Sequence, residues 1–198
     1  GALARFSQPY GIAYAGTYLY VADLANHSIR RIDPTTGTVT TFAGTSGTAG
    51  TTDGVGAAAL FRNPRGVTSD GTYLYVTDYG NNTIRRIDIS TRTVTTFAGS
   101  AGVAGNTNGV GGAALFSQPT GIIYTGGYLY VCDLANHRIR RIDAATRTVT
   151  TFAGTLAGYV DGVGTAARVR NPWDIDTDGT YLYVSEFGNH TIRRIEIS

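Results

Sequence analysis

The sequence predicts an all-β fold, a β-propeller of four-stranded antiparallel blades with four blades in the chain. One block of sequence recurs four times, and each copy holds short segments of β-forming residues separated by turn-forming residues. The proline that marks each copy recurs at intervals of 55, 55 and 53 residues, at Pro9, Pro64, Pro119 and Pro172. A sustained helical period is absent, which excludes helical solenoids, and a β-sandwich would not repeat its sequence so strictly.

The first repeat shows how each blade is expected to form. Thr, Val, Ile and Phe favour extended backbone in four segments, and Gly-, Asp- and Pro-containing stretches between them supply turns. The four strands are expected at residues 11–15, 18–23, 28–33 and 38–43.

The second strand predicts how the blades pack. Leu19 and Val21 alternate with Tyr18 and Tyr20, so both faces of this strand are apolar or aromatic. A strand of this kind should be buried between two neighbouring blades. The short stretch at residues 56–61 is expected to form one helical turn.

The whole chain, residues 1–198, is expected to form one domain, since its length suits a single domain and its 42% hydrophobic content can supply a core. The repeats span roughly residues 1–55, 56–110, 111–163 and 164–198.

The fourth repeat does not contain the Thr-Val-Thr-Thr-Phe-Ala-Gly strand of the other three, so the last blade is expected to lack its outer strand and to present an unpaired edge. Four blades could close into a ring alone, or two chains could combine into an eight-bladed ring. We expect self-association as a homodimer.

Composition excludes several classes of protein. The net charge is only +2, with no lysine, which argues against a nucleic-acid partner. No apolar run approaches the roughly 18 residues that a membrane-spanning helix needs, so no membrane partner is expected. Cys132 is the single cysteine and cannot form an intrachain disulfide; the small residues at its position in the other repeats, Ala22, Thr77 and Ser185, predict a small buried thiol.

The histidines and the glycine-rich loops are candidates for metal binding. His27, His137 and His190 occupy one position of the repeat, so they should lie about a blade apart, too far to share a metal ion. We interpret them as framework residues. The loops each carry one oxygen-bearing side chain in an Asp-Gly or Asn-Gly turn former, at Asp53, Asn108 and Asp161. A calcium site is the alternative for these loops, but no metal and no cofactor is predicted.

A repeated acid and a repeated arginine predict ion pairs inside each blade, because arginine can bind a carboxylate with two N–H groups. The alternative is a ring of carboxylates that holds a cation. The acids end the second strand, at Asp23, Asp78, Asp133 and Glu186. The arginines lie on the third strand, at Arg31, Arg86, Arg141 and Arg194.

The residue after each anchor proline is the strongest candidate for a binding site. It differs in every repeat although the residues around it barely change. Arginine and tryptophan are residue types that often anchor binding. The candidate ligand-binding residues at the channel mouth are Tyr10, Arg65, Thr120, Trp173 and the adjacent Asp174. No catalytic residue is predicted, because no repeated Ser, His and Asp arrangement stands out.

Four segments resemble the NHL repeat: ANHSIRRID at residues 25–33, DYGNNTIRRID at 78–88, DLANHRIRRID at 133–143 and EFGNHTIRRIE at 186–196. The resemblance covers essentially the whole chain and implies a β-propeller. It departs from the family in blade number, since NHL rings commonly have more than four blades. Similarity of the TFAG segments and the loops after them to secreted or envelope NHL proteins of bacteria implies an extracellular or cell-envelope location.

Three functions remain as hypotheses. The first is a non-enzymatic binding or scaffold module that presents its channel mouth and loops to a protein, peptide or glycan ligand. The second is an engineered or excised propeller fragment without an evolved ligand, which self-assembles. The third comes from the resemblance, since some NHL propellers are lyases with metals held by channel histidines; no histidine lies near the residues that follow the anchor prolines.

Overall fold

Each sequence repeat folds into one antiparallel sheet in the computed structural model, which describes residues 3–197. Blade one contains β1 (Pro9–Ala15), β2 (Tyr18–Asp23), β3 (Ser28–Ile32) and β4 (Val39–Ala43). Blade two contains β6 (Pro64–Ser69), β7 (Tyr73–Asp78), β8 (Thr83–Asp88) and β9 (Thr93–Ala98). Blade three contains β11 (Pro119–Thr125), β12 (Tyr128–Asp133), β13 (Arg138–Asp143) and β14 (Thr148–Ala153). Blade four contains β15 (Pro172–Thr177), β16 (Tyr181–Glu186) and β17 (Thr191–Glu196).

The predicted fold class is confirmed, including the three-stranded last blade. The strands of blade one lie within two residues of their predicted bounds. Two short strands were not predicted. They are β5 (Gly54–Val55) and β10 (Gly109–Val110), which cross from one repeat to pair with the outer strands β9 and β14 of the next blade.

Single 3₁₀ turns complete the structure. Three of them follow the second strand of a blade: η1 (Leu24–Asn26), η3 (Tyr79–Asn81) and η5 (Leu134–Asn136). The others lie between blades: η2 (Gly56–Ala58), η4 (Gly111–Ala113) and η6 (Gly164–Ala166). The turn predicted at residues 56–61 is therefore confirmed. None of the helical segments in residues 3–197 has the length and apolarity that a membrane span requires.

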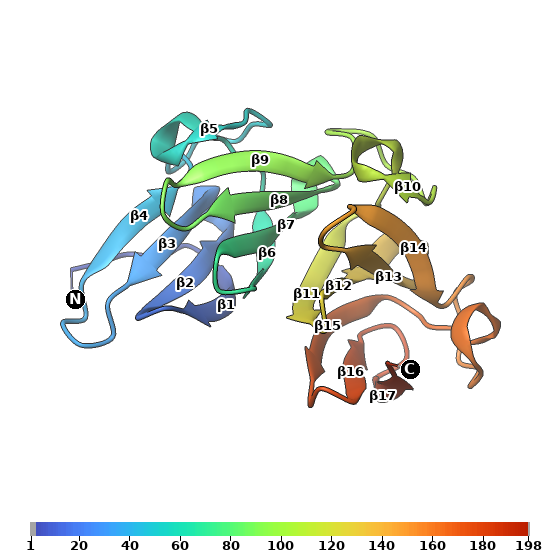
Figure 1. Ribbon diagram of the computed structural model, residues 1–198. Coiled ribbons are helices and arrows are strands. Elements are labelled where there is room, and N and C mark those ends of the chain that lie inside the picture. The colour runs from blue at the N-terminus through green and yellow to red at the C-terminus, as the bar shows by residue number, and fades with distance from the viewer. Residues whose placement is uncertain (1–2, 198) are drawn as a thin grey trace.

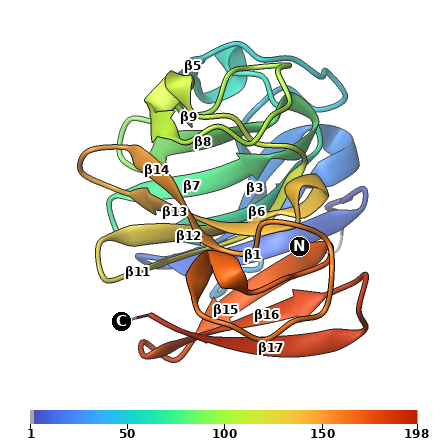
Figure 2. The same ribbon diagram turned by 90° about the vertical axis from the view of Figure 1, so that its right-hand side faces the viewer.

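The blades stand side by side in an arc, with blade one and blade four at its ends (Figure 1). In Figure 2, β15, β16 and β17 run side by side as the blade at one end of this arc. The first strand of each blade is innermost, and β6 packs against β1 and β11, while β11 packs against β15. These strands approach closely because the second residue after the anchor proline is glycine in blades one to three. A Cβ atom on Gly66 would lie 2.5 Å from the Thr120 carbonyl oxygen.

The apolar core lies between the blades, as the second strand predicts. Leu74, Tyr75 and Val76 of β7 are all buried, so both faces of this strand are covered. The Tyr75 ring also meets Phe97 of β9 edge to face, with 5.2 Å between ring centroids. Burial of these large side chains between sheets stabilises the neighbouring blades against one another.

The outward faces of blades one and four are open in the described chain. Ile192 of β17 is 70% exposed, whereas the isoleucines at its position in the other blades are 0% exposed: Ile29, Ile84 and Ile139. On the opposite end face, Ile12 of β1 is 57% exposed, whereas its counterparts are at most 6% exposed: Val67, Ile122 and Ile175. Each end face thus carries one half of the contact that joins two blades inside the chain.

Candidate functional site

A buried carboxylate connects several segments at one end of each blade. In blade two, Asp78 accepts hydrogen bonds from the backbone N–H of Arg62 at 2.7 Å, from Asn81 Nδ2 at 2.8 Å and from Arg85 Nη1 at 3.0 Å. Burial raises the pKa of Asp78 to about 6, against the lowering effect of Arg85 and of the bound N–H groups. The equivalent acids are buried with the same kinds of donor: Asp23, Asp133 and Glu186.

The predicted ion pairs exist, but the predicted arginines were wrong. The acids pair with the first arginine of each Arg-Arg dipeptide, namely Arg30, Arg85, Arg140 and Arg193. Adjacent residues of a strand point to opposite faces, and Arg30 lies opposite Val21 on the same face as Asp23. The second arginine points to the other face, over a tyrosine ring of the second strand. These arginines are Arg31, Arg86, Arg141 and Arg194.

The polar residues of the glycine-rich loops extend the same network. Asp53 Oδ1 lies 2.7 Å from Arg85 Nη2, and Asp53 Oδ2 accepts the backbone N–H of Thr96 at 3.1 Å. Asn108 and Asp161 contact the equivalent arginines in the next two blades. The loops therefore hold the arginines, and residues 3–197 contain no group of three or more acidic, His or Cys side chains that could hold a metal ion.

The histidines join one blade to the next. Nδ1 of His27 accepts the backbone N–H of Asn63, and Nδ1 of His137 accepts that of Asn171, both at 3.1 Å. His190 lies in the last blade, where its ring contacts Phe187. In both of these histidines Nδ1 is occupied as the acceptor of a backbone N–H, as expected for framework residues.

Three of the predicted site residues meet at the channel mouth although they belong to three blades. The Arg65 guanidinium lies 5.4 Å from the centre of the Tyr10 ring and 4.9 Å from that of Trp173. The Tyr10 and Trp173 rings are 5.9 Å apart. The structure therefore brings these three side chains into one cluster.

The other two predicted residues have different surroundings. Thr120 is 0% exposed, and its hydroxyl lies within hydrogen-bonding distance of two backbone carbonyl oxygens, 3.4 Å from that of Cys132 and 3.3 Å from that of Pro172. Its side chain is not on the surface of the mouth. Asp174 is exposed next to Trp173, and its Oδ1 accepts the N–H of Ile175. Partial burial of its carboxyl raises the pKa of Asp174, and Asp176 adds to this effect.

Two mouth residues were missed by the sequence analysis. Tyr79 stacks on Arg65, with 3.6 Å from the guanidinium carbon to the ring centre. Phe187 lies beside Trp173, with 5.5 Å between ring centroids. Both follow the acid that ends the second strand, where the other repeats have Leu24 and Leu134. Because the first and second strands are antiparallel, this position lies at the same end of the blade as the anchor proline, which is the signal that could have identified it.

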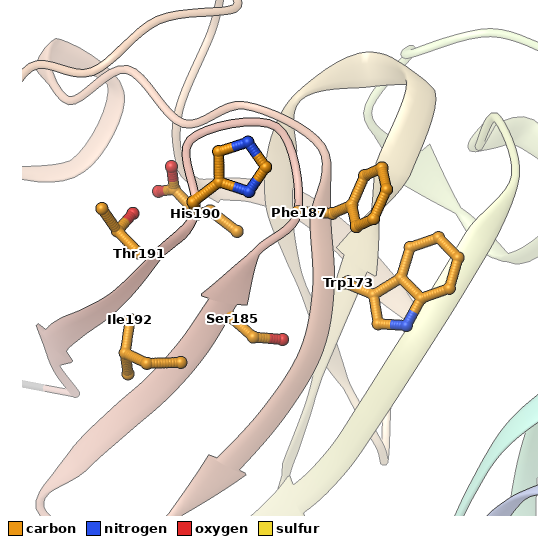
Figure 3. A pocket seen from close by; sticks show the side chains of 7 residues that line it. Trp173, Ser185, Phe187, His190, Thr191 and Ile192 are labelled. Carbon is orange, nitrogen blue, oxygen red and sulfur yellow. The ribbon is translucent and has the colours of Figure 1, made fainter.

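A cavity of about 310 Å³ opens beside Trp173 and Phe187 on blade four. Figure 3 shows the two rings next to each other, with Ser185, His190 and Ile192 among the other side chains around the cavity. We define the mouth cluster as six residues: Tyr10, Arg65, Tyr79, Trp173, Asp174 and Phe187.

The charge of Arg65 has no hydrogen-bonded partner among the described residues. Its Nε and Nη1 atoms are buried without a hydrogen bond, and it forms no ion pair. Desolvation raises the pKa of Tyr10 to about 12, in spite of the lowering effect of Arg65, so its hydroxyl stays protonated and can donate a hydrogen bond. Burial also raises the pKa of the Cys132 thiol, which is 0% exposed and therefore unsuited to react as a thiolate.

Comparison with known proteins agrees with the repeats. The model of the LVIVD repeat family matches residues 62–102. NHL repeat-containing protein 2 of Bos taurus is 34% identical over 167 residues, which cover 75% of this chain and 22% of that protein. The chain is an NHL-repeat β-propeller. Protein SUPPRESSOR OF QUENCHING 1 of Arabidopsis thaliana is 38% identical over 150 residues, 70% of the NHL chain and 14% of that protein. The NHL chain spans less than a third of these curated relatives.

Solved structures with the same fold are more distant in sequence. A Bacteroides thetaiotaomicron protein of unknown function superposes with a TM-score of 0.78 at 24% identity, over 95% of the NHL chain and 47% of that chain. An auxiliary nutrient-binding protein of Bacteroides ovatus superposes with a TM-score of 0.76 at 23% identity, over 97% of the NHL chain and 49% of that protein chain. Virginiamycin B lyase of Staphylococcus aureus superposes with a TM-score of 0.60 at 19% identity, over 97% of the NHL chain and 56% of the lyase chain. These likenesses establish the propeller fold.

Proposed function

We propose that this chain is a non-enzymatic binding module and that its mouth cluster holds the ligand. The observation that carries the proposal is Arg65, a cation without a hydrogen-bonded partner, which lies among the rings of Tyr10, Tyr79 and Trp173. The framework contacts recur from blade to blade, whereas the residue after the anchor proline differs in each repeat. Side chains that the framework does not use, gathered at one mouth, are what a binding site on a propeller requires.

The similar structures add support for a binding role. Two of them, from Bacteroides ovatus and Bacteroides thetaiotaomicron, are auxiliary nutrient-binding proteins. We therefore propose a cell-envelope or extracellular location and a protein, peptide or glycan ligand. Nucleic acid is a poor match to a net charge of +2.

A lyase function is the enzymatic alternative, because virginiamycin B lyase shares the fold. It has less support in this chain. Nδ1 of His27 and Nδ1 of His137 each accept a hydrogen bond from a backbone N–H, and neither residue belongs to the mouth cluster. We propose a binding role without catalysis.

Binding of glycan and peptide libraries to the immobilised chain tests the proposal. The expected result is a ligand whose affinity falls at least roughly tenfold in Trp173→Ala, because a buried aromatic anchor contributes about 2 kcal/mol or more. Tyr159→Ala is the matched control, since this aromatic residue is 62% exposed and lies in a loop outside the mouth. A ligand that binds both variants equally would place recognition elsewhere on the propeller.

Self-assembly is a second proposed function, favoured by the two open end faces. The exposed Ile192 face and the exposed Ile12 face are the two halves of a contact that is buried between consecutive blades of this chain. We propose that a second copy covers both faces, which gives an eight-bladed homodimer. Under this proposal the chain can serve as a self-assembling scaffold even without a ligand.

The mass in solution tests self-assembly. Light scattering after size exclusion should give twice the 20.9 kDa of the chain. Ile192→Asp should shift the mass to that of one chain, because it places a charge in the contact. Val163→Asp, at a loop residue that is 92% exposed, should leave the dimer intact. A single-chain mass for the unmodified protein would exclude the homodimer.

A further inference from the structure

Arg65 differs from the framework arginines in how its guanidinium is satisfied. Arg85 and Arg140 are buried, and each binds acceptors through both Nη1 and Nη2. Arg65 makes no hydrogen bond in the described chain, although its Nε and Nη1 are buried. The Nε atoms of Arg85 and Arg140 are also buried without an acceptor, so the difference lies in the Nη groups, which the framework satisfies in Arg85 and Arg140 but not in Arg65.

A buried N–H group of a charged side chain without an acceptor is unfavourable. The rings around Arg65 offset part of this cost, because a guanidinium over an aromatic face is attracted by the ring. They supply no acceptor in the plane of the guanidinium, where its N–H groups point. Nη2 is the group of Arg65 that an external anion can reach, because Nε, Nη1 and the nearby Tyr10 hydroxyl are buried.

We propose, resting on the binding function above, that the ligand of the mouth cluster is an acidic sugar whose carboxylate binds Arg65. The guanidinium forms a charge-assisted hydrogen bond to the carboxylate through Nη2, the Arg65 nitrogen that is not buried. The sugar ring lies toward Trp173 and Phe187, which continue the row of rings from Arg65.

The charges of the cluster favour a carboxylate over a phosphate. Arg65 is the one cation of the six residues, and Asp174 contributes an opposing negative charge at the same mouth. A phosphate dianion would meet a single guanidinium and a carboxylate that repels it. A monoanion matches this balance, and the exposed Asp174 carboxylate can accept hydrogen bonds from sugar hydroxyls.

The packing of the inner strands favours a sugar over a peptide bound as an added strand. Adding a strand requires a free strand edge with room for another backbone. The inner strands instead pack backbone to backbone at Gly11, Gly66 and Gly121, where even a Cβ atom would lie within 2.7 Å of the next strand. The mouth offers half-buried aromatic rings and the exposed ring of Phe187 rather than an open edge.

Trp173 is the only tryptophan of the chain, so its fluorescence reports on the mouth directly. We would titrate the full chain with galacturonate and with galactose, which lacks the carboxylate. Galacturonate should change the Trp173 emission and bind at least roughly tenfold more tightly than galactose. Arg65→Gln should lose this preference, whereas Arg147→Gln, which removes an exposed arginine at the outer edge of blade three, should keep it. Thermal unfolding would verify that both variants are folded.

Equal affinity for the two sugars, or an unchanged preference in Arg65→Gln, would overturn the proposal. Binding of peptides with a free C-terminal carboxylate, without a response to galacturonate, would overturn the sugar assignment. A different result would refute the binding function itself, namely a ligand whose affinity does not depend on Trp173. A ligand from the libraries that needs Trp173 but not Arg65 leaves that function intact and refutes the carboxylate contact alone.

Discussion

Nδ1 of His27 accepts the backbone N–H of Asn63 across the contact between blades one and two, over 36 residues of sequence. Asn82 does the same in blade two, where its Oδ1 accepts the N–H of Gln118 at 2.9 Å. Both residues have a positive φ, 54° for His27 and 58° for Asn82, so the side chain projects from the end of a 3₁₀ turn toward the next blade. Histidine and asparagine are therefore alternative acceptors for one contact between blades.

Replacement of His27 tests this contact. His27→Ala should lower the free energy of unfolding by about 1–2 kcal/mol, because the Asn63 N–H loses its acceptor. His27→Asn should keep most of the stability, since asparagine tolerates a positive φ and already provides the acceptor in blade two. Urea unfolding followed by circular dichroism would measure both. Equal losses in the two variants would contradict the role of the acceptor.

The equivalent bond of His137 should make stability depend on pH. Desolvation lowers the pKa of His137 below its usual value of about 6.5, and the nearby Arg170 adds to this effect. The unfolded chain then binds a proton at a higher pH than the folded chain. The contribution of neutral His137 is complete above about pH 6.5 and declines as the pH falls below it.

Melting temperatures between pH 8 and pH 5 would measure this effect. The unmodified chain should lose more stability than His137→Asn as the pH falls, because asparagine does not titrate in this range. A constant difference between the two proteins across the range would contradict the prediction.

The repeat predicted most of the fold because each blade uses the same local signals. Turn formers and β-forming residues located the strands, and the missing outer strand of blade four was predicted from its sequence. The short strands β5 and β10 were not predicted, since two residues carry no detectable alternation and their pairing is set by the neighbouring blade. The partner of Asp23 was misassigned because the relative direction of Arg30 and Arg31 depends on the strand register.

Gly66 should be intolerant of a side chain. Gly66→Ala places a Cβ atom 2.5 Å from the Thr120 carbonyl oxygen, so the inner strands of blades two and three must separate. We expect a loss of about 1–3 kcal/mol, as for other overpacked positions. Gly112→Ala is the control, because its Cβ atom would have no neighbour closer than 3.9 Å. Chemical denaturation should find Gly112→Ala close to the unmodified chain, and similar losses in both would refute the steric explanation.

Arg85 and Arg65 should respond differently to the same substitution. Arg85 is 1% exposed and pairs with Asp78 and Asp53, so Arg85→Gln leaves a buried carboxylate without its cation. We expect a loss of about 3–5 kcal/mol or of the cooperative transition itself. Arg65→Gln breaks no hydrogen bond but loses the contacts of the guanidinium with three rings, so we expect a smaller loss of about 1–2 kcal/mol. Thermal unfolding of the two variants compares them, and a larger loss for Arg65→Gln would show that this residue belongs to the framework.

The candidate site was predicted in part. The change of residue type after each anchor proline identified Tyr10, Arg65 and Trp173, which do meet. Thr120 lies below the surface because a small polar side chain at this position bonds to backbone instead of reaching the mouth. Tyr79 and Phe187 were missed because they lie on another segment, and only the antiparallel pairing brings them to the same end of the blade.

The buried acid of each blade is held by backbone and by side chains that recur in every repeat, while the residue just beyond the anchor proline takes no part in that network. The residue type can therefore change here without loss of the hydrogen bonds that hold the buried acid. Duplication of such a unit multiplies the positions open to variation, and their side chains can meet at one mouth, as those of Tyr10, Arg65 and Trp173 do. A lineage of these chains could acquire a repertoire of specificities by point substitution alone, with the rest of each blade inherited unchanged.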